Sequence, residues 1–145
     1  MNNNIIISAM TDEKEIELLL DKSSFNYTYD QDAIDSLKKR FLLKDSLYLL
    51  ATKDDKFAGF CSIDREWRED NFFFIREILV DSNSRKHGLG SKLMSQCLEH
   101  AKDRGAAGVV TETALENFPM QKLCEKLVFK KWENPQWQEG VTYKL

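Results

Sequence analysis

Apolar and polar residues form short blocks along the chain, and the spacing of the apolar positions differs between blocks. Ile34, Leu37 and Phe41 recur at the spacing of one helix face. Apolar runs at 47–52 and 57–63 have the length of strands and flank a short charged turn, which predicts a β-hairpin. Helical and strand patterns therefore mix along the chain, which is typical of an α/β or α+β fold.

The longest apolar run, FFFIREILV, spans residues 72–80. Such a run predicts a central strand that is covered on both faces of the sheet. Arg76 and Glu77 interrupt it. Two charges inside a central strand cost free energy unless they are paired or open to a cleft. They therefore predict either a structural ion pair or a functional site.

A charged turn with two glycines follows this strand and precedes a helix. It runs from Arg85 through Gly88 and Gly90, and the apolar face of the next helix begins at Leu93. Such a turn presents free backbone N–H groups and the positive end of a helix dipole. The pattern predicts an anion-binding loop.

The glycine spacing excludes two common kinds of anion site. The chain has no GxxxxGK[ST] motif, which a nucleoside triphosphate loop requires. Leu93 occupies the position where a dinucleotide-binding fingerprint has its third glycine. Neither a nucleoside triphosphate nor NAD is therefore the expected ligand.

Two separated motifs resemble those of the GNAT superfamily of N-acetyltransferases. Arg85, Gly88 and Gly90 match the pyrophosphate loop of that family, R/Q-x-x-G-x-G/A, at every specified place. A second family signature, N-x-x-A-x-x-L-Y-E-K-L-G-F, is matched by Asn117, Leu123, Glu125, Lys126, Leu127 and Phe129.

Three residues depart from the second signature. Met120 replaces its Ala, Cys124 replaces its Tyr, and Val128 replaces the Gly that commonly ends the helix in a left-handed conformation. The family Tyr protonates the departing thiolate of coenzyme A. Cys124 therefore has three possible roles, which are general acid, inert small apolar residue, and acyl-accepting nucleophile.

The resemblance implies one GNAT-like domain over residues 1–145. Its sheet would be mixed and mostly antiparallel, splayed between the fourth and fifth strands, and flanked by about four helices. Acetyl-CoA would enter the gap between these strands. The residues expected to hold it are Ile78, Leu79, Val80, Arg85, Lys86, His87, Gly88, Leu89, Gly90, Ser91 and Asn117. The alternative for His87 is that its side chain is exposed to solvent and does not contact the cofactor.

Acetyl transfer to an amine needs a deprotonated nitrogen near the thioester carbon, and a carboxylate can accept the proton. Glu77 is the first candidate, with a strand ion pair in the surroundings of Arg76 as its structural alternative. Glu112 is the second, because some family members carry a catalytic glutamate five residues before the position of Asn117. Its alternative is a structural carboxylate, and Thr111 and Thr113 must face the other side of the strand if Glu112 is catalytic.

Charge and cysteine content indicate which partners and which cellular compartment to expect. The 145 residues carry 21 Lys and Arg against 24 Asp and Glu, a net charge of −3, which does not indicate a nucleic-acid or anionic-membrane partner. No segment has the length of a membrane span. The cysteines, Cys61, Cys97 and Cys124, fit neither a disulfide framework nor a metal motif, so reduced thiols in the cytoplasm and no metal are expected.

The expected function is acetyl transfer from acetyl-CoA to a primary amine of a small molecule, by direct attack. Two other classes compete, which are a non-catalytic acyl-CoA sensor and an acetylase of a protein or other macromolecule. The acidic balance favours a cationic amine as acceptor. A homodimer is compatible with the sequence, which does not define the oligomeric state.

Overall fold

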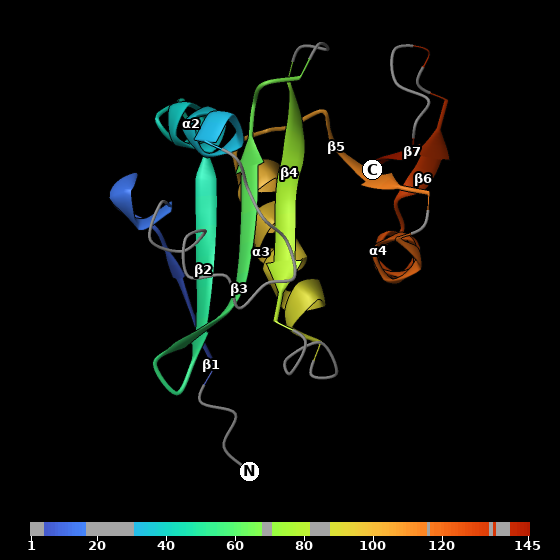
Figure 1. Cartoon of the computed structure of the whole chain (residues 1–145). Coiled ribbons are helices and arrows are strands. Elements are labelled where there is room, and N and C mark those ends of the chain that lie inside the picture. The colour runs from blue at the N-terminus through green and yellow to red at the C-terminus, as the bar shows by residue number, and fades with distance from the viewer. Residues whose placement is uncertain are drawn as a thin grey trace.

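A seven-stranded sheet forms the centre of this computed structural model, which describes residues 5–16, 31–67, 71–81, 88–115, 117–133, 135 and 140–145 (Figure 1). Its strands are β1 (Ile5–Ala9), β2 (Leu47–Lys53), β3 (Lys56–Asp64), β4 (Phe72–Val80), β5 (Gly108–Ala114), β6 (Lys130–Trp132) and β7 (Gly140–Lys144).

Helices occur at four places in the described residues. Residues 14–16 are helical, and the others are α2 (Gln31–Phe41), α3 (Leu89–Asp103) and α4 (Phe118–Lys126). None of the described helices is long and apolar enough to cross a membrane. The α2 helix lies on one face of the sheet and α3 on the other (Figure 1).

The strand order is β1-β2-β3-β4-β5-β7-β6, and only the β4–β5 pair is parallel. The predicted mixed and mostly antiparallel sheet is thus confirmed. The predicted hairpin is confirmed as β2 and β3, joined at Asp54 and Asp55, which have φ angles of 52° and 64°. Positive φ at both central residues is the feature of a type I′ turn, which matches the twist of antiparallel strands.

The sheet opens between β4 and β5, as the family resemblance implied. The two strands pair from Phe72 with Gly108 to Ile75 with Thr111, and both continue beyond that point without pairing to each other. The hydroxyl of Thr111 donates a hydrogen bond of 3.0 Å to the carbonyl oxygen of Ile75, the last paired residue of β4. Among the residues that the structure describes, no strand pairs with the second half of β4 on its β5 side.

A bulge at Arg76 changes which side chains of β4 face each side of the sheet. Glu77 pairs with Ser62 and Ile75 pairs with Ile63, which leaves Arg76 as an extra residue in β4. Ile75, Ile78 and Val80 pack with the core on the α3 side, which we call the α3 face. Arg76, Glu77 and Leu79 lie on the opposite side, which we call the α2 face.

Each face has its own hydrophobic core. On the α3 face, residues of α3 and α4 pack against the sheet, among them the fully buried Leu93, Met94, Cys97 and Cys124. On the α2 face, Ile34 and Leu37 of α2 pack with residues of β2 and β3. These two cores hold β4 between two helical layers and fix the position of its open half.

The α4 helix ends in a Schellman motif with a valine at the left-handed position. The N–H of Phe129 bonds to the carbonyl of Cys124 at 2.9 Å, and the N–H of Val128 bonds to that of Glu125 at 3.0 Å. Val128 has a φ of 62° and exposes 69% of its surface. The predicted left-handed end of the helix is therefore present, although a β-branched residue occupies it.

Candidate functional site

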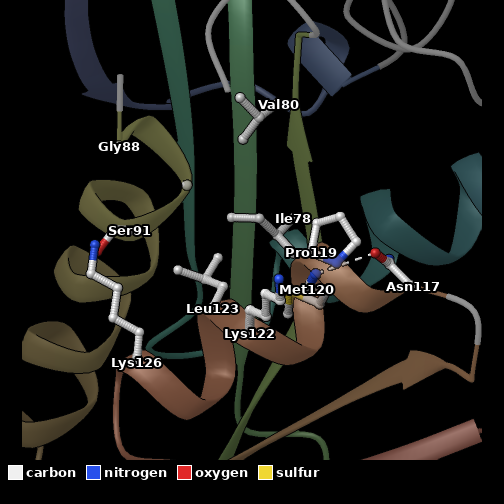
Figure 2. A pocket seen from close by; sticks show the side chains of 11 residues that line it. Ile78, Val80, Gly88, Ser91, Asn117, Pro119, Met120, Lys122, Leu123 and Lys126 are labelled. Carbon is white, nitrogen blue, oxygen red and sulfur yellow. Dashed lines mark hydrogen bonds between the residues drawn. The ribbon is translucent and has the colours of Figure 1, made fainter. Parts of the chain in front are cut away.

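A cavity of about 400 Å³ opens where β4 and β5 separate, on the α3 face. Its walls are the open half of β4, the first turn of α3 and one side of α4 (Figure 2). This volume lies within the range of small-molecule and cofactor sites. The lining residues are Ile78, Val80, Gly88, Gly90, Ser91, Asn117, Pro119, Met120, Lys122, Leu123 and Lys126.

The first turn of α3 presents backbone donors to this cavity. Gly88 is the residue that precedes the helix, has a φ of 70°, and supplies no side-chain cap. The helix begins with a bond of 3.1 Å from the N–H of Lys92 to the carbonyl of Gly88. The earlier N–H groups of the first turn have no intrahelical acceptor, so they form an anion-binding helix terminus.

Gly90 lies at a close approach of three elements. A Cβ atom at this position would be 3.3 Å from Cδ2 of Leu123 on α4 and 3.6 Å from Cγ2 of Val80 on β4. Any side chain there would fill the corner of the cavity between the strand and the two helices. Because Gly90 has no side chain, the N-terminus of α3 remains open to a ligand.

Asn117 forms the opposite rim and begins α4. Its side-chain oxygen accepts a hydrogen bond of 3.3 Å from the N–H of Met120, which caps the helix. Pro119 follows in the first turn of the helix, where its missing N–H costs no hydrogen bond. Asn117 therefore caps α4 in addition to its position on the cavity.

The three predicted cofactor residues of β4 divide between the two faces. Ile78 and Val80 line the cavity, whereas the side chain of Leu79 packs against the core of the α2 face. The sequence motifs predict no cavity role for Lys122 or Pro119, and they contain Leu123 and Lys126 only as matches to the helix signature. The spacing of Lys122 and Lys126, one helical turn apart, was the available signal that both lie on one side of α4.

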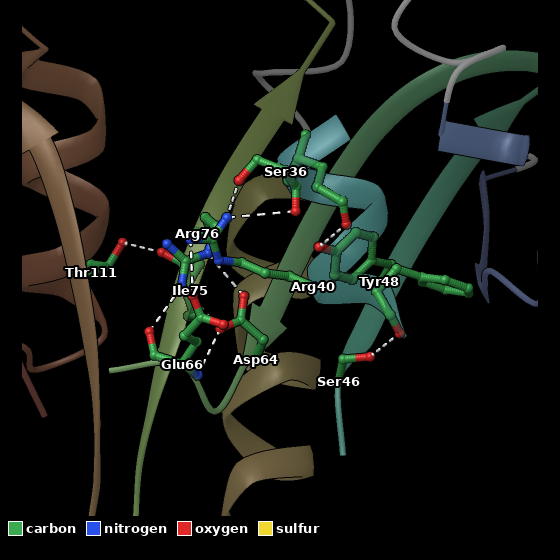
Figure 3. Close-up of polar contacts among 11 residues, drawn as sticks. Ser36, Arg40, Ser46, Tyr48, Asp64, Glu66, Ile75, Arg76 and Thr111 are labelled. Carbon is green, nitrogen blue, oxygen red and sulfur yellow. Dashed lines mark hydrogen bonds and ion pairs between the residues drawn. The ribbon is translucent and has the colours of Figure 1, made fainter. Parts of the chain in front are cut away.

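The α2 face of β4 carries a network of charged side chains (Figure 3). Arg76 pairs with the buried Asp64 through hydrogen bonds of 2.9 and 3.0 Å, and also donates to the carbonyl of Glu66. Burial lowers the pKa of Arg76, but the bonds to Asp64 outweigh this effect and raise it. Arg40 of α2 pairs with Glu66 at 3.0 Å and hydrogen-bonds to Ser36. The structural ion pair considered for Arg76 is therefore present, with Asp64 as partner.

Glu77 is half-buried on this same face, directly opposite Ser62 in the register with β3. The hydroxyl of Ser62 is buried and has no hydrogen-bond partner among the described residues. On the β2 side, Ser62 pairs with Tyr48, whose hydroxyl donates a hydrogen bond of 2.7 Å to the carbonyl of Leu37. Burial, followed by the charge of Asp64, raises the pKa of Tyr48.

Glu112 is half-buried on β5 and accepts a hydrogen bond of 3.4 Å from the hydroxyl of Thr142 on β7. Strand alternation places it on the side of Val110, whose register partner Phe74 faces the Arg76 guanidinium. Glu77 and Glu112 thus lie on the same face of the sheet. Thr111 and Thr113 are buried, as expected if they face the other side.

Cys124 is fully buried in the core of the α3 face and does not line the cavity. Burial, followed by the charge of Glu125, raises the pKa of its thiol to about 12. The hydroxyl of Tyr143 lies in the same core without a hydrogen-bond partner among the described residues. Burial, followed by the charge of Cys124, raises the pKa of this hydroxyl as well.

Three predicted cofactor residues, Arg85, Lys86 and His87, lie outside the described residues. Leu89, the first residue of α3, is fully buried and does not line the cavity, whereas Ser91 does. No group of three or more metal-ligating side chains occurs among the residues that the structure describes.

Comparison with known proteins agrees with this geometry. Residues 14–129 match the family described as Acetyltransferase (GNAT) family, so the chain belongs to the GNAT acetyltransferases. The expected enzyme class is thereby confirmed. No curated protein sequence matches the chain.

Solved structures share the fold at low sequence identity. A GNAT-family acetyltransferase from Staphylococcus aureus has a TM-score of 0.76 at 18% identity, covering 97% of each chain. The ribosomal-protein-S18-alanine N-acetyltransferase from Escherichia coli has a TM-score of 0.76 at 16% identity, covering 97% of this chain and 92% of its own. PaiA N-acetyltransferase from Thermoplasma acidophilum, in complex with coenzyme A, has a TM-score of 0.71 at 15% identity, covering 97% of each chain.

Proposed function

We propose that this GNAT acetyltransferase transfers an acetyl group from acetyl-CoA to a primary amine of a small molecule, by direct attack. The observation that carries the proposal is the cavity at the opening between β4 and β5, with the uncapped terminus of α3 at one end. A pyrophosphate needs backbone donors and close approach, which Gly88 and Gly90 provide. The structure of a relative in complex with coenzyme A supports this choice of ligand.

The pantetheine arm would lie along Ile78 and Val80, whose side chains form the apolar floor of the cavity. The register of β4 with β5 ends at Ile75 and Thr111, and beyond it the backbone groups of Ile78 and Leu79 on the β5 side face no strand among the described residues. Such groups can hydrogen-bond the amides of the arm and polarise the thioester carbonyl, in the manner of an oxyanion hole. Asn117 would complete this part of the site from the other rim.

The acceptor amine would approach from the α2 face, where Glu77 and Glu112 lie. A protonated amine first gives one proton to a carboxylate or to a water that the carboxylate orients. The nitrogen then attacks the carbonyl carbon, the C–S bond breaks, and the thiolate gains the second proton as the amide forms. The net products are an acetylated amine, the free thiol of coenzyme A and one proton.

Cys124 would act in this scheme as a buried core residue, not as the proton donor of the thiolate. Its full burial and its raised pKa support this role among the three that the sequence left open. Reduced, buried thiols also agree with action in the cytoplasm, which we propose as the location.

An acceptor panel assayed by release of the coenzyme A thiol tests the proposed function. The panel holds a polyamine, an aromatic ethylamine, an amino sugar and a lysine-containing peptide, and acetyl-CoA affinity is measured in parallel by calorimetry. Turnover with at least one small amine, well above that with the peptide, is the expected result. Binding without turnover on any amine would favour the sensor, preferential turnover of the peptide would favour a macromolecular acetylase, and absence of acetyl-CoA binding would refute the proposal.

A further inference from the structure

One polar side chain in the core of the α2 face forms no hydrogen bond within the described residues. The hydroxyl of Ser62 on β3 is fully buried and has no partner there. An unpaired hydroxyl in a protein interior costs stability, so a group of this kind needs an explanation. Both of its cross-strand neighbours are polar, because Ser62 lies opposite Tyr48 of β2 and opposite Glu77 of β4.

The two neighbours of Ser62 differ in what they offer to its hydroxyl. The hydroxyl of Tyr48 donates to the carbonyl of Leu37 on α2 and forms no bond to Ser62. Glu77 is half-buried, and its ionised carboxylate has only acceptor atoms. Residues directly opposite in an antiparallel pair have Cβ atoms about 4.5–5.5 Å apart, so the longer side chain of Glu77 can reach the Ser62 hydroxyl. Donor and acceptor therefore match across β3 and β4.

Glu77 shares the α2 face with titratable and charged groups from each element packed there. These groups are Tyr48 on β2, Asp64 on β3, Glu66 after β3, Arg76 on β4, Glu112 on β5 and Arg40 on α2. Each arginine already pairs with a carboxylate other than Glu77, at 2.9 and 3.0 Å. The uncharged donors beside Glu77 are Tyr48, whose hydroxyl bonds to Leu37, and Ser62. Ser62 is thus the donor that can orient the carboxylate without pairing its charge.

We propose that Ser62 is a positioning residue for acetyl transfer, and that in the acceptor complex its hydroxyl donates a hydrogen bond to the Glu77 carboxylate and holds it toward the amine. Ser62 keeps its own proton, and the proton of the amine goes to Glu77. Hydrogen bonds of catalytic groups often tighten only when the substrate binds, so this bond belongs to the acceptor complex. The inference rests on the proposed function, and it makes Glu77, not Glu112, the base.

Loss of this hydroxyl has a signature in the dependence of rate on pH. A hydrogen bond to a carboxylate favours its charged form, so without Ser62 a higher pH is needed to ionise Glu77 in the acceptor complex. The pH profile of kcat reports groups in that complex, whereas the profile of kcat/KM reports the free enzyme. The bond therefore predicts a shift of the acid limb in the kcat profile and none in the kcat/KM profile.

The test measures both pH profiles by release of the coenzyme A thiol, with the amine of the acceptor panel that has the highest turnover. The proteins are the wild type, Ser62→Ala, Ser62→Thr and Ser46→Ala. In Ser62→Ala we expect kcat to fall about tenfold and the acid limb of its profile to move up by about one pH unit. Ser62→Thr retains a hydroxyl and should retain the acid limb of the wild type.

Ser46→Ala is the matched control, because the Ser46 hydroxyl donates a bond of 2.6 Å to the carbonyl of Phe41 at the end of α2. Loss of this bond should lower the melting temperature by a few degrees and leave both pH profiles unchanged. Ser62→Ala removes an unpaired hydroxyl, so its melting temperature should equal or exceed that of the wild type. Opposite effects on stability and on the pH profile distinguish a positioning role from a structural one.

A double-mutant cycle with Glu77→Gln tests whether Ser62 acts through Glu77. If it does, Ser62→Ala should not lower turnover further in the Glu77→Gln background. An equal loss in both backgrounds would overturn the inference, and so would an unmoved acid limb in Ser62→Ala or wild-type turnover in Glu77→Gln. In each of these outcomes the wild type still acetylates an amine. A wild type that binds no acetyl-CoA, or acetylates no amine of the panel, would overturn the proposed function and this inference together.

Discussion

The two faces of the open half of β4 differ in the kind of group that they present. On the α3 face, Ile78 and Val80 are apolar, and the polar groups are backbone N–H donors at the glycine-marked start of α3. On the α2 face, Arg76 pairs with the buried carboxylate of Asp64, Glu77 lies opposite Ser62, and Arg40 of α2 pairs with Glu66. The α3 face therefore presents apolar side chains and backbone donors, and the α2 face presents charged side chains.

The bulge at Arg76 produces this separation. In a regular strand, Arg76 and Ile78 would share a face, and a guanidinium would lie beside the cavity. The extra residue moves Arg76 to the side of Asp64 and leaves only apolar side chains toward the cavity. The comparison predicts that added atoms on the α3 face abolish binding, whereas isosteric changes of charge on the α2 face alter turnover and spare binding.

The largest expected effect is that of Gly90→Asp. Its side chain would enter the corner between Val80 and Leu123, and its charge would repel a phosphate at the start of α3. We expect no measurable binding of acetyl-CoA by calorimetry, in a variant whose circular dichroism spectrum remains that of the wild type.

Gly90→Ala is the matched control, because it adds a Cβ without charge. With Leu123 Cδ2 only 3.3 Å away, a shift of a few tenths of an ångström is needed, so a smaller loss of affinity is expected. Unchanged affinity in a folded Gly90→Asp variant would mean that acetyl-CoA binds elsewhere. It would contradict the assignment of binding to the α3 face and of turnover to the α2 face.

On the charged face, Glu77→Gln and Glu112→Gln are the informative changes. At least one should lower turnover about 10²-fold, because a general base is lost, while the acetyl-CoA affinity stays at the wild-type value. The variant that removes the base should also lose the rise of the rate with pH that deprotonation of the base produces.

Glu66→Gln is the control on this face, because Glu66 pairs with Arg40 at the surface and has no role in the proposed chemistry. It should keep wild-type turnover across pH. If both Glu77→Gln and Glu112→Gln behave like this control, neither carboxylate assists the amine, and the charged face is structural only.

The sequence predicted the elements of the fold well because their patterns are local. The hairpin at Asp54 and Asp55, the helix α2 with Ile34 and Leu37 on one face, and the long strand β4 each follow from a few neighbouring residues. The family resemblance, and not periodicity, supplied the splay between β4 and β5. Their parallel pairing joins segments more than thirty residues apart, as in Ile75 with Thr111, and no local pattern encodes it.

The site was predicted less completely, for physical reasons. The bulge at Arg76 depends on register with β3, so alternation along β4 alone assigns the wrong face to Arg76 or Glu77. The partner of Arg76 is Asp64, 12 residues earlier in the chain, and nothing in the sequence pairs them. The cavity role of Lys126 depends likewise on how α4 packs against α3.

Cys124→Ala should have a smaller effect than the glutamate variants and retain at least about a tenth of the wild-type rate. The thiol is fully buried, lies outside the cavity and donates no proton in the proposed scheme, so its removal takes no catalytic group from the site. A loss beyond about 10²-fold to 10⁴-fold, with acetyl label trapped on the wild-type protein, would instead indicate a covalent route through Cys124.

The same thiol predicts a pH effect on stability. Its pKa rises from 9.0 to about 12 on folding, because burial disfavours the thiolate. The stability that depends on the neutral thiol is therefore complete below pH 9 and is lost as the pH rises toward 12. Urea unfolding at a series of pH values should show a steeper alkaline loss for the wild type than for Cys124→Ala, and equal slopes would contradict the assigned burial.

The smallest effect belongs to Val128→Gly, at the end of α4 and away from both faces of β4. A β-branched residue at a φ of 62° costs about 1–2 kcal/mol, part of which the greater freedom of glycine in the unfolded chain offsets. With 69% of its surface exposed, Val128 contributes little packing that the change would remove. We expect a melting temperature a few degrees higher, with acetyl-CoA affinity and turnover as in the wild type.

Val128→Asn and Val128→Ala sharpen this last comparison. Asparagine tolerates the left-handed conformation better than alanine, so the melting temperature should follow the order glycine, asparagine, alanine if backbone strain decides the effect. If the order follows the loss of apolar surface instead, with glycine the least stable, the valine side chain stabilises this end of α4. A change in acetyl-CoA affinity without a change in melting temperature would show that the end of α4 adjusts the cavity wall, and that this helix affects binding independently of stability.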